Sequence, residues 1–152
     1  MAARVLDIRY IAGITDGEGC ITIVKRSIAG VNGARFIPVV VISMTDKAAV
    51  RQIHRRFGGT LYLKKANKPG HKPAWQWRIT GHNLLNFLKA VSPYLLVKGT
   101  QAKLAMKLAK IQAANRQGAV KGEWGRRALS RELVVQRAAI CKEIQRLNKR
   151  GV

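Results

Sequence analysis

One short stretch limits what this chain can fold into: YIAGITDGEGCITIV, from Tyr10 to Val24. Its apolar residues have helical spacing up to Asp16, after which the sequence breaks on Gly-Glu-Gly and continues with the residues of a β-strand. The chain has only seven acidic residues, and one of them, Glu18, lies between two glycines at this corner. That placement makes Glu18 a candidate functional residue.

Hydrophobic periodicity and turn residues predict the other elements. We expect helices over 6–16, 47–57, 82–95, 100–115 and 130–148, and strands over 20–27, 35–45, 60–65 and 74–80. Pro38 suggests an edge position or a bulge in the second strand. Two hairpins, each followed by a helix, predict an α+β fold with one antiparallel four-stranded sheet and helices on a single face. The length suits one domain over 1–152, with a core at about 6–115 and a C-terminal helical extension at about 116–152.

Charge indicates the class of partner. The chain has 29 Lys and Arg residues against seven Asp and Glu, a formal net charge of +22, and no acid lies between Lys47 and Gly122. Such a charge destabilises a compact chain unless a polyanion neutralises it, which favours DNA or RNA. No segment pairs a basic face with the exposed apolar face of an interfacial helix, so a membrane is not the expected partner.

The N-terminus has no signal-peptide core, and no apolar run approaches a membrane span. We therefore expect an intracellular protein, of a bacterial cytoplasm or an organelle matrix and not secreted. Cys20 and Cys141 lack metal-ligand spacing and are interpreted as reduced thiols.

The predicted sheet leaves one face without helices. Alternation places on it a set of residues that, apart from Val24, are donors and cations: Thr22, Val24, Arg26, Arg35, Ser43, Tyr62, Lys64, Gln76 and Arg78. A two-stranded ribbon fits the major groove of B-DNA, where such side chains contact base edges. The alternative is an ordinary solvated face, but such faces normally mix both signs of charge. Lys68 and Lys72, in the basic hairpin tip, are expected to grip backbone phosphate.

Small residues on the first helix indicate a close helix contact. Gly13 and Gly17 are four residues apart, with Ala12 beside them, and each glycine costs a helix about 1 kcal/mol relative to alanine. A bare face of this kind needs a partner packed on it. If that partner is the same helix of a second copy, two Glu18 carboxylates meet, which divalent cations between them would make tolerable.

These residues closely resemble the motif of the LAGLIDADG homing endonucleases. YIAGITDGEG, Tyr10–Gly19, matches it at Ala12, Gly13, Asp16 and Gly19, and PYLLVKGTQA, 93–102, resembles the family's Pro-aromatic-Leu…Lys…Gln-Ala segment. The resemblance covers about residues 6–115. It implies an αββαββα fold whose sheet forms a concave DNA-binding saddle, and, since the motif occurs once, a homodimer formed through the Tyr10–Gly19 helix.

The resemblance also implies roles for individual residues. The chain would be an intron- or intein-encoded enzyme that cuts a long, pseudo-palindromic DNA duplex by metal-dependent hydrolysis. Glu18 matches the catalytic metal-binding carboxylate, Gly17 the neighbour whose carbonyl reaches the metal, and Lys98 the basic residue near the scissile phosphate. Mg²⁺ is the expected metal, and other divalent cations also suit the chemistry. The dimer contact would involve Ala12, Gly13, Asp16 and Gly17, with Asp16 structural at the helix end.

One position departs from the family pattern. Several members have a glutamine near the attacking water at the end of the second strand, where this chain offers Ser43, Thr45 or Asp46 instead. A second hypothesis is a non-cleaving binder on the same fold, either a maturase that binds intron RNA or a transcription-factor-like relative that has lost cleavage. The presence of both Glu18 and Lys98 favours the enzyme. A basic ribosomal or chromatin protein would explain the charge but not the Gly-Glu-Gly corner.

Overall fold

Four strands form one antiparallel sheet in the spatial order β1–β2–β4–β3. The computed structural model describes residues 5–27, 34–66, 68–117 and 131–149, to which the structural statements below refer. The elements in chain order are α1 (Ile8–Glu18), β1 (Gly19–Ser27), β2 (Ala34–Met44), α2 (Lys47–Phe57), β3 (Thr60–Lys64), β4 (Ala74–Thr80), α3 (Gly81–Val91), the 3₁₀ turn η1 (Ser92–Tyr94), α4 (Gly99–Gln117) and α5 (Arg131–Leu147). This is the predicted order, with boundaries displaced by a few residues. The segment IAGVNGA, 28–34, also predicts a Gly/Asn turn between the first two strands, and its residues 28–33 lie outside the described residues.

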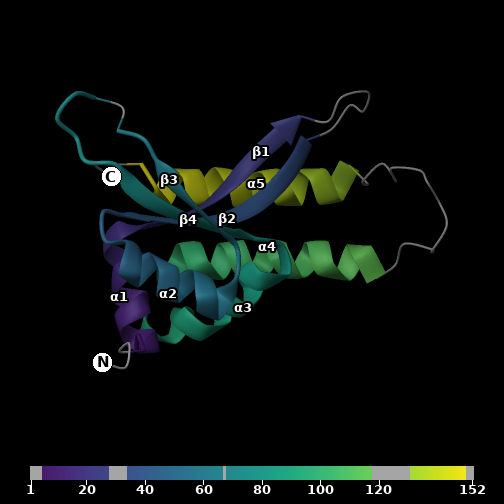
Figure 1. Cartoon of the computed structure of the whole chain (residues 1–152). Helices are drawn as coiled ribbons and strands as arrows, with labels where there is room; N and C mark the ends of the chain where they lie inside the picture. Colours follow the sequence, from purple (N-terminus) through teal and green to yellow (C-terminus); the bar gives the residue numbers. More distant parts are fainter. Residues whose placement is uncertain (1–4, 28–33, 67, 118–130, 150–152) are drawn as a thin grey trace.

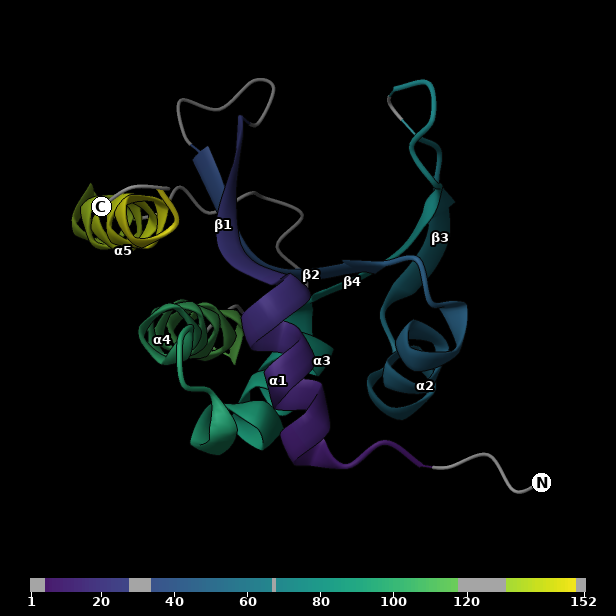
Figure 2. The same cartoon turned by 90° about the vertical axis from the view of Figure 1, so that its left-hand side faces the viewer.

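The sheet is bent into a saddle. Figure 2 shows β1 and β3 rising on either side of a concave surface, while α1, α2, α3 and α4 lie below it. The same layers are visible from the side in Figure 1, where α5 lies along β1. The concave face therefore carries no helix, as the sequence pattern predicts.

Alternation within the strands sorts the side chains between the two faces. Ile21, Val40 and Trp77 point toward the helices and are fully buried. Trp77 donates from Nε1 to the carbonyl of Gly58 over 2.8 Å, and its ring lies edge-on to Phe87 at 4.9 Å between centroids. A buried indole that finds a hydrogen-bond acceptor costs little to desolvate. The core between sheet and helices thus fixes which side of each strand remains on the saddle.

Helix α5 covers the outer edge of β1. Its residues Arg137, Ile140, Cys141 and Ile144 are buried. The Cys141 thiol lies 3.8 Å from the carbonyl oxygen of Ile23, on the side of β1 that has no neighbouring strand. Covering an edge strand in this way removes a template for pairing with another chain. The extension therefore packs onto its own domain.

Pro38 lies at a local edge, although β2 is an inner strand of the sheet. It lies in the inner strand β2, paired with Ile23 of β1. Pairing between β2 and β4 begins only at Val39, so no strand flanks β2 on the β4 side at Pro38. On β2 nearby, the carbonyl of Phe36 accepts from the side-chain amide of Gln112 in α4. Pro38 is tolerated because β2 is an edge strand over this short part.

Candidate active site and nucleic-acid interface

At position 19, the corner between α1 and β1 has room only for glycine. Helix α1 runs through Gly17 and Glu18, two residues beyond the predicted end, and Gly19 begins β1. A Cβ on Gly19 would lie 2.5 Å from the carbonyl oxygen of Thr15, far inside a normal contact. The backbone N–H of Gly19 donates to the same carbonyl. Glu18 is therefore the last helical residue, exposed at a tightly closed corner.

Lys98 caps the end of this helix. Its Nζ donates to the carbonyl of Thr15 at 3.1 Å and also to the carbonyl of Asp16. A cation is favourable here because the last carbonyl groups of a helix are unsatisfied and carry the negative end of its dipole. These contacts explain why α1 continues past Asp16, and they place the Lys98 ammonium beside the two residues that precede Glu18.

Asp16 fixes the segment that carries Lys98. Its carboxylate accepts the backbone N–H groups of Leu96 at 2.7 Å, Val97 at 3.2 Å and Lys98 at 2.9 Å. Burial by itself raises the pKa of this carboxyl, but the three N–H donors and the nearby Lys98 charge outweigh burial and hold the pKa below its usual value. Asp16 is thus the structural residue that the sequence predicts at the helix end.

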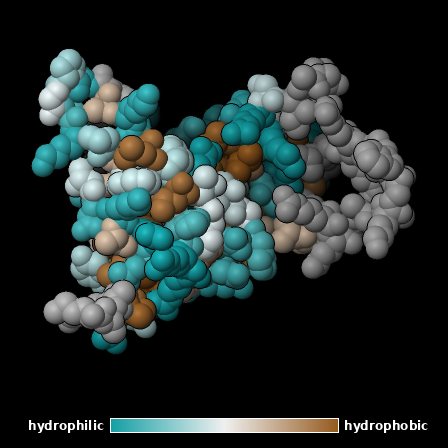
Figure 3. All heavy atoms as spheres, viewed as in Figure 1, coloured by the Kyte–Doolittle hydropathy of each residue, from teal (hydrophilic) through white to brown (hydrophobic). Residues whose placement is uncertain are grey.

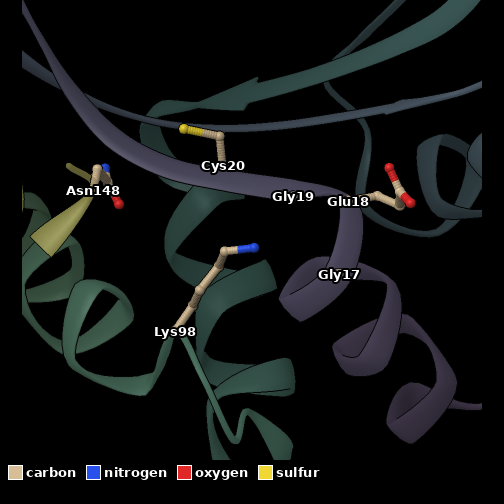
Figure 4. Close-up of a pocket in the computed structure, with 6 residues that line it drawn as sticks. All are labelled: Gly17, Glu18, Gly19, Cys20, Lys98 and Asn148. Atoms are coloured by element: carbon tan, nitrogen blue, oxygen red, sulfur yellow. The ribbon is translucent and has the colours of Figure 1, made fainter. Parts of the chain in front are cut away.

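The predicted catalytic pair lines one pocket. Its walls are Gly17, Glu18, Gly19, Cys20, Lys98 and Asn148. In Figure 4 the Lys98 side chain extends into the space between α1 and β1, whereas the Glu18 carboxylate is directed away from Lys98. The structure therefore brings both residues to one corner without joining them as an ion pair. Sequence reasoning missed Cys20 and Asn148, and only the alternation of β1 could have indicated that Cys20 faces the open side.

The oxygen atoms at this corner could bind a hard divalent cation only as part of a larger set of ligands. Glu18 offers carboxylate oxygens and Gly17 a backbone carbonyl, the oxygen ligands that Mg²⁺ prefers. Within the described residues no group of three or more His, Cys, Asp or Glu side chains gathers around one point. Mg²⁺ commonly takes one or two carboxylates and completes its shell with water and phosphate. Glu18 and Gly17 fit that pattern if a second copy or a substrate supplies the remaining ligands.

The open face of the sheet carries the predicted polar residues in register. Arg26 pairs with Arg35 across β1 and β2, Ser43 with Gln76 across β2 and β4, and Gln76 with Tyr62 across β4 and β3. Paired residues of antiparallel strands point to the same face. The same pairing aligns the rest of the predicted surface on the concave side: Thr22, Val24, Lys64 and Arg78.

Two features extend this surface. Tyr62 donates its hydroxyl hydrogen to Oε1 of Gln76 over 2.6 Å, which leaves the amide nitrogen of Gln76 free as a donor. Lys68 and Lys72 are exposed in the connection between β3 and β4, beyond the end of the saddle. Figure 3 shows a largely hydrophilic exterior in that view, with hydrophobic side chains only in small separate groups. Apart from Val24, the predicted residues of the concave face and its tip are cations and hydrogen-bond donors.

The outer side of α1 is partly bare. Gly13 and Gly17 are exposed, and a Cβ on either would meet nothing within 4 Å. Beside the end of this helix, the side chains of Leu96 and Val97 are 92% and 72% exposed, although Asp16 binds their amides. Exposed apolar residues next to a bare helix face are typical of an interaction surface.

Ala12 requires a correction to the predicted dimer contact. Its side chain is 0% exposed within the chain's own core, so it faces away from any partner. Adjacent helix positions are about 100° apart, and the face that buries Ala12 differs from the one that exposes Gly13. Asp16 also uses its carboxylate within the chain, so its part in a dimer contact stays a prediction.

Solved structures share this fold. No protein-family model matches the chain, and no curated protein sequence matches it either. The homing endonuclease I-CvuI in complex with DNA superposes with a TM-score of 0.71 at 17% identity, over 95% of this chain and 84% of that one. The archaeal intron-encoded homing endonuclease I-Vdi141I, complexed with DNA, superposes with a TM-score of 0.71 at 18% identity. This match covers 95% of this chain and 86% of that one.

A longer protein matches as well. The K103A mutant of I-SmaMI superposes with a TM-score of 0.72 at 15% identity. This match covers 98% of this chain but only 47% of the I-SmaMI chain. These likenesses show that the chain has the LAGLIDADG homing endonuclease fold, so the fold that the motif resemblance implies is confirmed. Among the described residues no helix is long and apolar enough to cross a membrane.

Proposed function

We propose that this chain, which has the LAGLIDADG homing endonuclease fold, is a site-specific endonuclease that cuts both strands of a long, pseudo-palindromic DNA duplex as a homodimer. The observation that carries the proposal is the position of the Glu18 and Lys98 pocket at the α1–β1 corner, where the cationic concave face begins. A pure binding protein needs the cationic face but has no use for a carboxylate and an ammonium at its centre.

The chemistry follows from the side chains at this corner. Bound divalent cations, Mg²⁺ foremost, would activate a water molecule and stabilise charge on the scissile phosphate. Glu18 and the carbonyl of Gly17 would hold such a cation from the protein side. Lys98, fixed by the carbonyls of Thr15 and Asp16, would present its remaining N–H toward the negative charge that develops on the phosphate.

The dimer follows from α1. A single copy supplies one Glu18, whereas cutting two strands requires two such corners. The exposed face of α1, with Gly13 and Gly17 and the neighbouring Leu96 and Val97, would let two backbones approach closely. The chain spans about half of I-SmaMI, so two copies of this chain would match that protein in size.

The DNA contacts would come from the saddle. Side chains of the concave face would contact base edges or phosphates in the major groove. The proposed residues are Arg26, Arg35 and Arg78, together with Thr22, Val24, Ser43, Tyr62, Lys64 and Gln76. Lys68 and Lys72 would hold backbone phosphate beyond the end of the sheet. The complexes of I-CvuI and I-Vdi141I with DNA support DNA as the partner.

The proposal is tested by a cleavage selection. The purified protein is incubated with a randomised duplex library and Mg²⁺, beside Glu18→Gln and the control Glu143→Gln, which removes the same charge from an exposed ion pair on α5. We expect new ends at one long, roughly palindromic site with the wild type and the control, and none with Glu18→Gln. Duplex binding by Glu18→Gln should be intact or tighter, because repulsion from phosphate is reduced. Cutting by Glu18→Gln at the wild-type rate would refute the assignment.

One observation favours a second candidate, an RNA-binding maturase on the same fold. Lys103, Lys107 and Lys110 form an exposed row on α4, on the helical side of the sheet and away from the saddle. Duplex DNA in the saddle would not neutralise this row. If the library yields a bound consensus sequence without new ends, the same protein is titrated with the intron RNA of its host gene. Loss of RNA binding in the triple variant Lys103→Gln/Lys107→Gln/Lys110→Gln would then support the maturase.

A further inference from the structure

The end of α5 reaches the corner that carries Glu18. Asn148, directly after this helix, donates from Nδ2 to the carbonyl of Ile21 over 2.9 Å, across 127 residues of sequence. The Cys141 thiol makes the equivalent contact to Ile23, two residues further along β1. Both contacts attach α5 to the side of β1 that has no neighbouring strand.

Asn148 differs from Cys141 because it also lines the pocket of Glu18 and Lys98. A carbonyl oxygen can only accept, so the NH₂ group of the Asn148 amide must face Ile21, and its Oδ1 is turned to the other side. Figure 4 shows the amide nitrogen toward β1 and the oxygen toward the pocket. The pocket thus receives a neutral acceptor from the last described turn of the chain.

Ile21 is three residues beyond Glu18, at the start of β1. On the helix side of the corner, Lys98 holds the carbonyls of Thr15 and Asp16. On the strand side, the bond from Asn148 holds the carbonyl of Ile21. Glu18 therefore lies between two attachments that come from segments distant in sequence.

We propose that Asn148 is a positioning residue for cleavage: it fixes β1 beside Glu18 and closes the pocket with its amide oxygen. The inference rests on the proposed endonuclease activity. Groups that act on a reacting phosphate must be held within about 0.5 Å of their working positions, and small displacements cost rate more than binding. The C-terminal extension would then serve catalysis directly, in addition to covering the sheet edge.

The test compares Asn148→Ala with Cys141→Ala, its matched control. Each removes one attachment of α5 to β1, but only Asn148 lines the pocket. With the cognate duplex, we expect Asn148→Ala to lower the single-turnover cleavage rate by about 10-fold or more and to raise the Mg²⁺ concentration for half-maximal rate. The DNA dissociation constant should stay within about twofold of the wild-type value, and the two variants should have similar melting temperatures. Cys141→Ala should cleave at nearly the wild-type rate.

Other outcomes overturn the inference. Equal rate losses in the two variants would mean that Asn148 matters only for attaching α5. A wild-type rate and Mg²⁺ dependence in Asn148→Ala would mean that it has no part in cleavage. If Asn148→Ala loses DNA binding in parallel with rate, it is a DNA contact and not a positioning residue. A wild-type protein that cuts no duplex would refute the proposed function itself, and the inference with it.

Discussion

The carboxylate of Asp16 holds three consecutive backbone N–H groups, those of residues 96–98, beside the end of α1. These bonds are charge-assisted, which makes them stronger than bonds between neutral groups. They also aim Lys98 at the carbonyls of Thr15 and Asp16. One acidic residue thus connects two segments that are 80 residues apart in the chain and meet at the candidate active site.

Asp16→Asn should destabilise the fold by about 1–3 kcal/mol at neutral pH, because the amide has no charge and one acceptor oxygen fewer. The folded state lowers the pKa of Asp16, so its stabilising effect is present above the unfolded pKa, about 3.9, and is lost as pH falls through the lower folded value. Urea unfolding of both proteins at pH 7 and below pH 4 measures the difference. The stability gap should narrow at the lower pH, and a gap independent of pH would show that charge is not its cause.

Helix α1 carries two glycines that its own chain does not require. A Cβ on Gly13 would meet nothing within 4 Å, in contrast to Gly19, where it would collide with the carbonyl of Thr15. Glycine inside a helix costs about 1 kcal/mol relative to alanine, so the monomer alone would be more stable with alanine at position 13. The proposed dimer would account for the exposed glycine, because a partner helix could then approach the helix backbone closely.

Gly13→Ala should therefore raise or preserve the stability of the monomer while weakening the dimer about tenfold or more, since an added methyl in a close contact typically costs 1–3 kcal/mol. Sedimentation equilibrium over a range of protein concentrations measures the dimer constant, and thermal unfolding of the diluted protein measures the monomer. Ala139→Ser, one added atom at an exposed position of α5, is the control. An unchanged dimer constant in Gly13→Ala would place the dimer contact elsewhere.

The helices and strands, and the face on which each side chain lies, could be predicted from the sequence because they depend on local periodicity. Alternation in β1 and β4 placed Thr22 and Gln76 on the open face, where the register puts them. Contacts between segments that are distant in the sequence could not be predicted in this way. The bond from Asn148 to Ile21 spans 127 residues, and no local pattern indicates it. Ala12 was misplaced for a similar reason, since only the packing of α1 decides which of its small residues is buried.

At the scale of the whole molecule, the few acidic residues are distributed very unevenly, so most of the positive charge has no acid nearby. Among the described residues, ion pairing is confined to Arg146 and Glu143 on α5. Helices α2, α3 and α4 and strands β3 and β4 contain no acid. Uncompensated charge of one sign opposes folding by self-repulsion, and counterion release on binding a polyanion turns the same charge into affinity. The salt dependence of binding therefore reports which cations meet DNA.

For a dimer that neutralises about nine phosphates through the saddle, the slope of log K against log salt concentration should be about −8. Removing two phosphate contacts in each copy with Lys68→Gln/Lys72→Gln should make the slope shallower by about 3 to 4 in the dimer. Lys103→Gln/Lys107→Gln removes the same charge from α4, on the other side of the sheet, and should leave the slope nearly unchanged. Fluorescence anisotropy with a labelled duplex at several salt concentrations measures all three proteins. Equal changes in the two double variants would show that the whole surface attracts DNA without preference, and would contradict binding through the saddle.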